Sequence, residues 1–283
     1  MQNHLLNKTP SNSLNCESIG VMDSGVGGLS VLHHINRLMP YESLTYVADS
    51  QYAPYGNLNA KEITERCFEV ADFLITQGVK AIVVACNTAT AASIRLMRAR
   101  YTIPIIGMEP AVKPATLTSK KGVIGVLATV STLNSTQFST LLTTYSQHVQ
   151  VHTQACTGLV ECIELGEIES EKTKTLLTQY CSPLINLGVD TIVLGCTHYP
   201  FVHQLIKDIV GNDITLIDTG VAVANHLQLT LENQALLTPT ETKPSIIIWT
   251  NNNAVDRESV IQKLWNKEGI QIKNMTLLSK QIS

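Results

Sequence analysis

The chain has 283 residues, of which 44% are hydrophobic and 15% are charged, and its formal net charge is −3. This length and composition predict two compact lobes of roughly 100–150 residues each and exclude a disordered protein. The slightly acidic balance offers no basic patch to neutralise phosphates, so nucleic acid is not an expected partner.

The N-terminal 17 residues are rich in Asn and Ser and lack the basic start and apolar core of a secretory signal. We expect residues 1–17 to form a loose extension. No apolar run reaches the roughly 18 residues of a membrane-spanning helix. Seven cysteines without a C-x-x-C pair indicate reduced thiols. The sequence therefore predicts a soluble, cytoplasmic protein that does not bind a membrane.

Strand patterns alternate with helical patterns in the first half of the chain, which is typical of a parallel α/β sheet. We expect strands over 18–23, 44–50 and 81–86. Apolar residues at three- and four-residue spacing predict helices over 29–38 and 63–74.

The second half repeats this pattern about 105 residues later, where residues 122–129 echo the first strand. Further strands over 149–156 and 191–196 and a helix over 171–187 complete it. The internal repeat ends at about residue 220. We expect the final segment, with a strand at 246–251, to return to the first lobe. Two domains of similar build account for so long a period.

The predicted fold is α/β, with two pseudo-symmetric lobes that are each a mainly parallel sheet flanked by helices. The active site is expected in the cleft between them. We assign residues 18–110 and 220–283 to the first lobe and residues 111–219 to the second.

Two nearly identical stretches carry the most specific signal: LITQGVKAIVVAC ends at Cys86, and LINLGVDTIVLGC ends at Cys196. Each cysteine follows a buried strand, and ligands of open α/β sheets bind in the crevice outside the carboxyl ends of the strands. A helix start directly after a cysteine favours thiolate. Two facing thiols suit inversion of a stereocentre, in which one removes a proton and the other returns one to the opposite face.

Single cysteines at strand ends are more often inert packing than chemistry. The duplication argues against this interpretation for Cys86 and Cys196. It does not do so for the cysteines without a symmetric partner, which we interpret as buried packing residues: Cys16, Cys67, Cys156, Cys162 and Cys181.

Further polar motifs lie at strand ends. DSGVGG is a strand-to-helix turn whose N–H groups can hold an anion, but no acidic residue completes a dinucleotide fingerprint. Asp23 is equally consistent with helix capping and with catalysis. His198, two residues after Cys196, is consistent with a proton acceptor for that thiol or with a surface histidine.

Four motifs in this order and spacing resemble the glutamate racemases of the aspartate/glutamate racemase superfamily. They are DSGVGGLSVL, ADSQYAPYG, ACNTATA and GCTHYPF, and the similarity runs from about residue 19 to 220. The resemblance implies a racemase that interconverts L- and D-glutamate without a cofactor or metal. Its partner would be a small-molecule substrate, and its product would supply peptidoglycan synthesis, cell-wall biogenesis and cell shape.

The resemblance also implies the roles of residues. Cys86 would act on D-glutamate and Cys196 on L-glutamate, with catalytic support from Asp23, His198 and Glu164. The substrate would be bound by residues of all four motifs: Asp23, Ser24, Tyr55, Gly56, Asn87, Thr88, Thr197 and His198.

One segment departs from the family pattern. The auxiliary glutamate is expected eight residues after a cysteine-proline pair, and that count from Cys156 leads to Glu164, but Thr157 stands where proline is usual. Glu161 is therefore an alternative for this carboxylate.

Two other functions remain open on the sequence alone. The same fold and thiols would serve aspartate or a broader set of amino acids. Alternatively, Cys86, Cys196, His198 and Cys156 would bind zinc, although C-x-H is not a usual ligand interval. The sequence also leaves the oligomeric state open, with a homodimer as one expectation.

Overall fold

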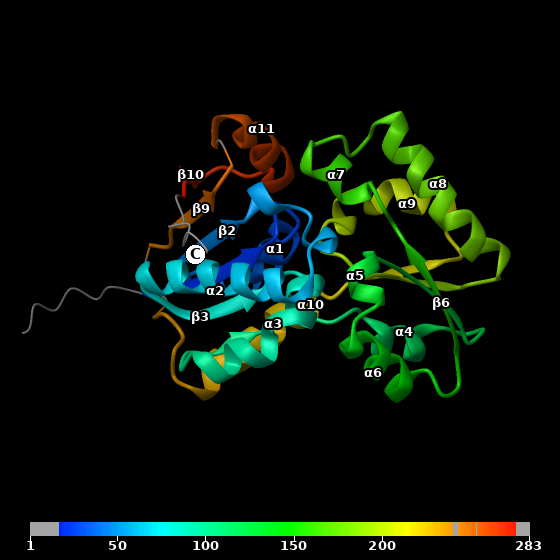
Figure 1. The fold of residues 1–283 in the computed structure, drawn as a ribbon, viewed down its shortest axis with the longest axis horizontal. Coiled ribbons are helices and arrows are strands. Elements are labelled where there is room, and N and C mark those ends of the chain that lie inside the picture. The colour runs from blue at the N-terminus through cyan, green and yellow to red at the C-terminus, as the bar shows by residue number, and fades with distance from the viewer. Residues whose placement is uncertain (1–16, 240–242, 253, 276–283) are drawn as a thin grey trace, which may run out of the picture.

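The computed structural model describes residues 17–239, 243–252 and 254–275. These residues form two sheets in which every strand pair is parallel, each flanked by helices (Figure 1). The predicted two-lobed α/β fold is confirmed.

The first sheet has the strand order β10-β9-β2-β1-β3-β4, and the second has the order β6-β5-β7-β8. The first sheet consists of β1 (Ser18–Asp23), β2 (Leu44–Ala48), β3 (Val79–Val84), β4 (Ile105–Ile106), β9 (Ile246–Thr250) and β10 (Ile270–Asn274). The second consists of β5 (Val123–Ala128), β6 (Gln150–Ala155), β7 (Thr191–Leu194) and β8 (Thr215–Ile217).

The internal repeat extends to the topology. Strands β2-β1-β3-β4 and β6-β5-β7-β8 are wound in the same order, so the strands before Cys86 and Cys196 occupy equivalent positions. Among the described residues, the C-terminal strands β9 and β10 have no counterpart in the second sheet. β9 pairs with β2, and β10 pairs with β9, so that they extend the first sheet beyond β2.

The helices cover both faces of each sheet. They are α1 (Leu29–Leu38), α2 (Ala60–Thr76), α3 (Asn87–Arg100), α4 (Val112–Thr118), α5 (Val130–Leu133), α6 (Thr136–Tyr145), α7 (Leu159–Glu164), α8 (Glu171–Asn186), α9 (His203–Val210), α10 (Gly220–Asn233) and α11 (Ala254–Trp265). Short 3-10 turns span Ser50–Tyr52, Tyr55–Asn57 and Tyr199–Val202.

Alternation along the strands assigns side chains to these layers, because successive residues of a strand face opposite sides. In β1, Val21 packs in the cluster that contains α1, α10 and α11, whereas Met22 packs in the cluster of α2 and α3. Both faces are therefore apolar, as a parallel sheet between helical layers requires.

Local signals set the ends of α2. Asn59 forms a capping box with Glu62, in which the Asn59 side chain accepts from the Glu62 N–H and the Glu62 carboxylate accepts from the Asn59 N–H. The helix ends just before Gly78, which adopts the left-handed conformation with φ 75°. The next strand starts at once and leads toward Cys86.

The structure does not test two of the predictions made from the sequence. Residues 1–16, including Cys16, are outside the described residues, and the exact domain boundaries stay a prediction. Among the residues that the structure describes, no helix is long and apolar enough to cross a membrane.

A buried ion pair lies at the end of the first sheet where β3 begins. The Lys80 ammonium is 2.6 Å from Glu42, and their side chains are only 5% and 3% exposed. Thr238, which follows α10, donates to the Glu42 carboxylate through its N–H and its hydroxyl. The pair therefore fixes the chain after α10 against the sheet.

Removing one partner of this pair should be more harmful than removing both. Lys80→Met leaves a buried carboxylate uncompensated and should lower the free energy of unfolding by about 3–5 kcal/mol. The double variant Glu42→Gln/Lys80→Met should recover a large part of that loss. Urea unfolding of the three proteins measures both effects, and equal losses in the single and double variants would contradict this account.

Candidate active site

A small pocket lies at the carboxyl ends of β1, β3 and β7, between the two sheets. The space between its lining atoms, including the part open to solvent, is about 270 Å³. Its lining consists of Ser24, Pro54, Tyr55, Gly56, Cys86, Asn87, Thr88, Thr129, Val160, Gly195, Cys196, Thr197 and His198. Both repeat cysteines therefore face the same space, one from each half of the chain.

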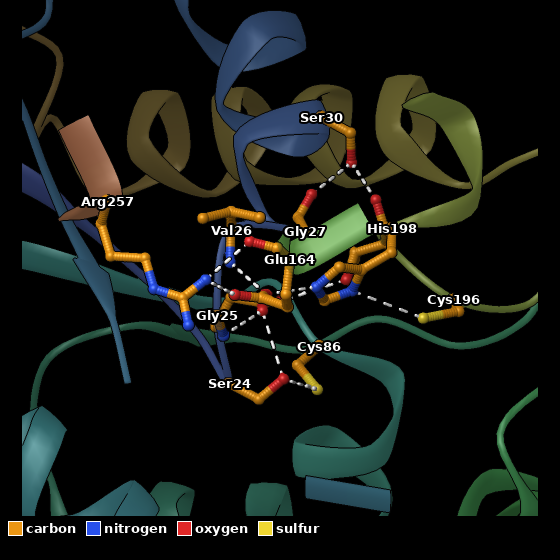
Figure 2. Close-up of polar contacts among 12 residues, drawn as sticks. Ser24, Gly25, Val26, Gly27, Ser30, Cys86, Glu164, Cys196, His198 and Arg257 are labelled. Atoms are coloured by element: carbon orange, nitrogen blue, oxygen red, sulfur yellow. Dashed lines mark hydrogen bonds and ion pairs between the residues drawn. The ribbon is translucent and has the colours of Figure 1, made fainter. Parts of the chain in front are cut away.

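Cys86 is the N-cap residue of α3. The Ala89 N–H donates to its sulfur at 3.4 Å, and its thiol is 3.9 Å from the Ser24 hydroxyl (Figure 2). Burial, and then the charge of Asp23, raise the pKa of the Cys86 thiol well above its ordinary value. The expectation that the helix start favours thiolate is therefore wrong for Cys86, because burial outweighs the hydrogen bond from the Ala89 amide and keeps the thiol protonated.

Cys196 has a different setting. The chain after it forms the 3-10 turn Tyr199–Val202 before α9, so Cys196 does not cap an α-helix. Instead, the Nδ1 atom of His198 lies 3.6 Å from its sulfur. The two cysteines thus occupy equivalent strand ends but have different neighbours.

His198 is held by a carboxylate from the second sheet's helical layer. Its Nε2 atom is 2.6 Å from Oε1 of Glu164, which also accepts the Val26 N–H at 2.7 Å (Figure 2). This contact fixes a proton on Nε2 and turns Nδ1 toward Cys196. Burial lowers the pKa of His198, but hydrogen bonds to Cys196 and Glu164 outweigh it, so this pKa lies well above 6.5.

Of the two candidate glutamates, the structure brings Glu164 to this cluster. Glu164 is 4% exposed and contacts His198 directly. Glu161 lies one turn earlier on α7, is half-buried and does not line the pocket.

Asp23 ends β1 and is fully enclosed. Its carboxylate accepts the Gly25 N–H at 2.7 Å and the Thr197 hydroxyl at 2.9 Å, so it joins the ends of β1 and β7. Burial raises the pKa of Asp23 to about 6, against the opposing effect of His198. Asp23 therefore holds a charge that its surroundings compensate only in part.

The expected substrate-binding residues Asn87 and Thr88 differ in whether their side chains already have hydrogen-bond partners within the protein. Within the described part of the chain, both polar atoms of the Asn87 side chain are buried without a hydrogen-bond partner. The Thr88 hydroxyl lies 3.0 Å from both Thr129 and Thr132. Of these two side chains, Asn87 is therefore the one whose polar atoms are available to a ligand.

The Tyr55 hydroxyl does not point to a ligand, because it donates to Asp49 at 2.5 Å. Asp49 also accepts two N–H groups of Arg66, at 2.6 and 2.9 Å, and a hydrogen bond from Asn251. This network holds the loop that presents Pro54, Tyr55 and Gly56. Sequence reasoning missed it, although Asp49 directly follows β2 and Asp23 is the last residue of β1.

Two glycines permit the close approach of the two halves. A Cβ atom at Gly25 would lie 1.9 Å from Oε1 of Glu164, and one at Gly27 would lie 2.2 Å from Nδ1 of His198. The glycine-rich turn therefore does hold an anion on a backbone N–H group, as predicted, but that anion is the protein's own Glu164.

The zinc interpretation finds no support in the arrangement. Within the described residues, no group of three or more His, Cys, Asp or Glu side chains is placed to hold a metal ion. Cys156 is buried outside the pocket, and its thiol contacts the Gln154 carbonyl. Cys67, Cys162 and Cys181 are buried and free as well.

Replacing Asp23 should change the pH dependence of stability. A carboxyl group with a raised pKa favours the folded state below the unfolded pKa of about 3.8 and loses that contribution as the pH rises to about 6. Asp23→Asn should therefore be more stable than the parent protein at pH 7.5, by about 1–3 kcal/mol.

This difference should shrink toward pH 4. Urea unfolding of both proteins at a series of pH values measures the difference in their free energies of unfolding. The contributions of titratable groups that both proteins contain cancel in this difference. A difference that stays constant from pH 4 to 8 would contradict the assignment of the raised pKa to Asp23.

Comparison with known proteins now gives the family. Residues 19–227 match the family described as Asp/Glu/Hydantoin racemase. The glutamate racemase of Ectopseudomonas mendocina is 48% identical over 251 residues, which make up 88% of this chain and 95% of that protein.

Solved structures agree. A glutamate racemase isoform of Bacillus anthracis has a TM-score of 0.84 at 34% identity, with 92% of this chain and 98% of that chain covered. The Escherichia coli glutamate racemase, in complex with L-glutamate and an activator, has a TM-score of 0.82 at 26% identity, with 93% and 100% covered. The chain therefore belongs to the Asp/Glu/Hydantoin racemase family, among its glutamate racemases, and is an isomerase.

Proposed function

We propose that this protein interconverts L- and D-glutamate by proton transfer at Cα between Cys86 and Cys196, without a cofactor. The observation that carries the proposal is that two buried thiols, from equivalent strand ends of the two halves, line one small pocket. The Escherichia coli relative binds L-glutamate, which supports glutamate as the substrate.

The surroundings of the two thiols support a division of labour. In the L-to-D direction, Cys196 removes the α-proton, and its own thiol proton has first passed to Nδ1 of His198, 3.6 Å away. Cys86, whose buried thiol is protonated, then donates its proton to the opposite face of Cα. The L-to-D reaction leaves Cys86 as a thiolate and Cys196 as a thiol. The reverse reaction starts from this state, in which Cys86 removes the α-proton of D-glutamate and Cys196 donates its proton to the opposite face of Cα.

The groups around the pocket suit the charges of an amino acid. We assign the substrate ammonium to Asp23, whose buried carboxylate is compensated only in part. We assign carboxylate binding to the side chain of Asn87 and to the hydroxyl groups of Ser24, Thr88 and Thr197, together with the backbone of Tyr55 and Gly56. None of the residues that line the pocket is a lysine, so a Schiff-base cofactor has no anchor there.

The chemical difficulty is the low acidity of the α-proton. Its removal places a second negative charge on the substrate carboxylate, and aligned donors in a water-poor site stabilise this charge more effectively than water does. The buried amide of Asn87 and the N-terminus of α3 are such donors. The buried position of both cysteines excludes competing solvent protons.

The same proposal gives the cellular role. D-Glutamate would be supplied in the cytoplasm for peptidoglycan synthesis, and so for cell-wall biogenesis and cell shape. Light scattering after size-exclusion chromatography tests the homodimer expected from the sequence.

The proposal is tested by incubating the purified protein with L-glutamate in deuterium oxide while circular dichroism and the α-proton NMR signal are followed. We expect ellipticity to disappear while deuterium enters Cα. Unchanged L-glutamate in the presence of folded protein would overturn the choice of substrate. L-Aspartate is the matched comparison, and its faster turnover would reassign the substrate.

Replacing either thiol should abolish two-base catalysis. Cys86→Ser and Cys196→Ser should each reduce racemisation by about 10²- to 10⁴-fold, because a hydroxyl is a far weaker acid than a thiol. Cys181→Ser, at a buried cysteine outside the pocket, is the matched control. Polarimetric rates from each enantiomer measure the effect, and near-parental rates in either pocket variant would contradict the mechanism.

A methyl group at Gly27 should displace the histidine. Gly27→Ala places its Cβ within 2.2 Å of Nδ1 of His198, and a shift of about 1 Å in a reacting group costs about 10²-fold in rate. Gly20→Ala, whose Cβ meets only apolar side-chain atoms at 3.2 Å, is the control for the added methyl group. Equal rates in the two variants would show that the turn tolerates a side chain.

A further inference from the structure

Helix α11 belongs to the C-terminal segment that the internal repeat does not contain. It lies between β9 and β10 of the first sheet in the chain, yet Figure 1 shows it beside α7, which belongs to the second lobe. A helix from one half thus reaches the other half close to the candidate active site.

Two cationic side chains of α11 contact the end of α7. Arg257 donates to the backbone carbonyl of Glu164 at 2.6 Å, and Lys263 donates to the carbonyl of Gly166 at 2.8 Å. The Glu164 carbonyl belongs to the last residue of α7, where a helix leaves its C=O groups unpaired and cations are favoured, and the Gly166 carbonyl lies two residues beyond it. Both side chains therefore dock α11 onto α7.

Arg257 differs from Lys263 in a second contact. Its Nη1 atom is also 3.4 Å from Oε2 of the Glu164 carboxylate, and its side chain is only 16% exposed (Figure 2). The other carboxylate oxygen, Oε1, accepts from Val26 and His198. Arg257 thus completes the environment of a carboxylate whose opposite oxygen orients the histidine beside Cys196.

We infer that Arg257 is a positioning residue for proton transfer at Cys196, acting through Glu164 and His198. It prevents the carboxylate from rotating and keeps Oε1 on the imidazole. Val26 and Arg257 both come from the first-sheet side, whereas Glu164 comes from α7. Separation of the halves would break both contacts, so the orientation of His198 is tied to their closed arrangement. This inference rests on the proposed racemase function.

Racemisation provides a directional readout. The two enantiomers have equal free energies, so any variant must lower kcat/KM equally in both directions. Primary kinetic isotope effects, in contrast, can change differently in the two directions. If only proton transfer at Cys196 slows, the isotope effect with α-deuterated L-glutamate rises, because Cys196 breaks the Cα–D bond of that enantiomer. The isotope effect with α-deuterated D-glutamate then falls, because Cys86 breaks its Cα–D bond.

The experiment compares Arg257→Met with Arg257→Lys and with Lys263→Met. We expect Arg257→Met to lose about tenfold in kcat/KM with the opposed isotope effects described above, and Arg257→Lys to recover part of the rate. Lys263→Met removes the neighbouring contact to α7 without touching the carboxylate, and it should keep the parental rate and isotope effects. Thermal unfolding verifies that each variant is folded.

Two results would overturn the inference: unchanged isotope effects in Arg257→Met, or the same loss in Lys263→Met. A readout without turnover separates this inference from the proposed function. The ¹⁵N resonances of the His198 imidazole should move in Arg257→Met and not in Lys263→Met. If they do so while the parental protein leaves glutamate unchanged, the positioning role stands and the proposed function fails.

Discussion

The hydrogen bonds of the Glu164 carboxylate are the contact on which the rest of the site depends. One oxygen accepts from Val26, in the turn after β1, and from His198, in the segment after β7. Three separate parts of the chain therefore meet at a single atom. Bare backbone is needed for this meeting, because a side chain at Gly25 would collide with the carboxylate itself. The glycine-rich turn, the orientation of the imidazole and the setting of Cys196 follow from one buried anion.

The duplication of the fold makes the positions of the two thiols equivalent but not their chemistry. Cys86 caps α3 and contacts the Ala89 amide and the Ser24 hydroxyl, whereas Cys196 is paired with an imidazole. The two enantiomers have equal free energies, but the two sides of the active site need not be chemically equivalent. Unequal thiols change how the barrier is shared between the two proton transfers and leave the overall equilibrium untouched. A duplicated scaffold can therefore carry a different supporting group on each side of one pocket.

Features that depend on local sequence were predictable. Strand and helix periodicity gave the α/β fold, and the matched runs before Cys86 and Cys196 placed both thiols at equivalent strand ends, where the structure has them. What was missed depends on contacts between distant segments. The Asp49–Arg66 pair and the contact of Arg257 with Glu164 join residues 17 and 93 positions apart, and no local pattern encodes them. The thiol of Cys86 was misjudged because the burial of a side chain is set by the whole fold.

Asp23 and Asp49 show that the surroundings of a buried carboxylate distinguish a structural role from ligand binding. Asp23 is the last residue of β1, Asp49 directly follows the adjacent strand β2, and both are buried. Asp49 receives two N–H groups from Arg66, so a permanent opposite charge compensates it inside the protein. In the described part of the chain, Asp23 accepts hydrogen bonds from an amide and two hydroxyl groups, and its pKa is raised to about 6. A buried acid that lacks a full counter-charge destabilises the fold. Under the proposed function, the substrate ammonium would supply that charge, so the cost of leaving Asp23 partly unpaired would be recovered as affinity when the ligand binds.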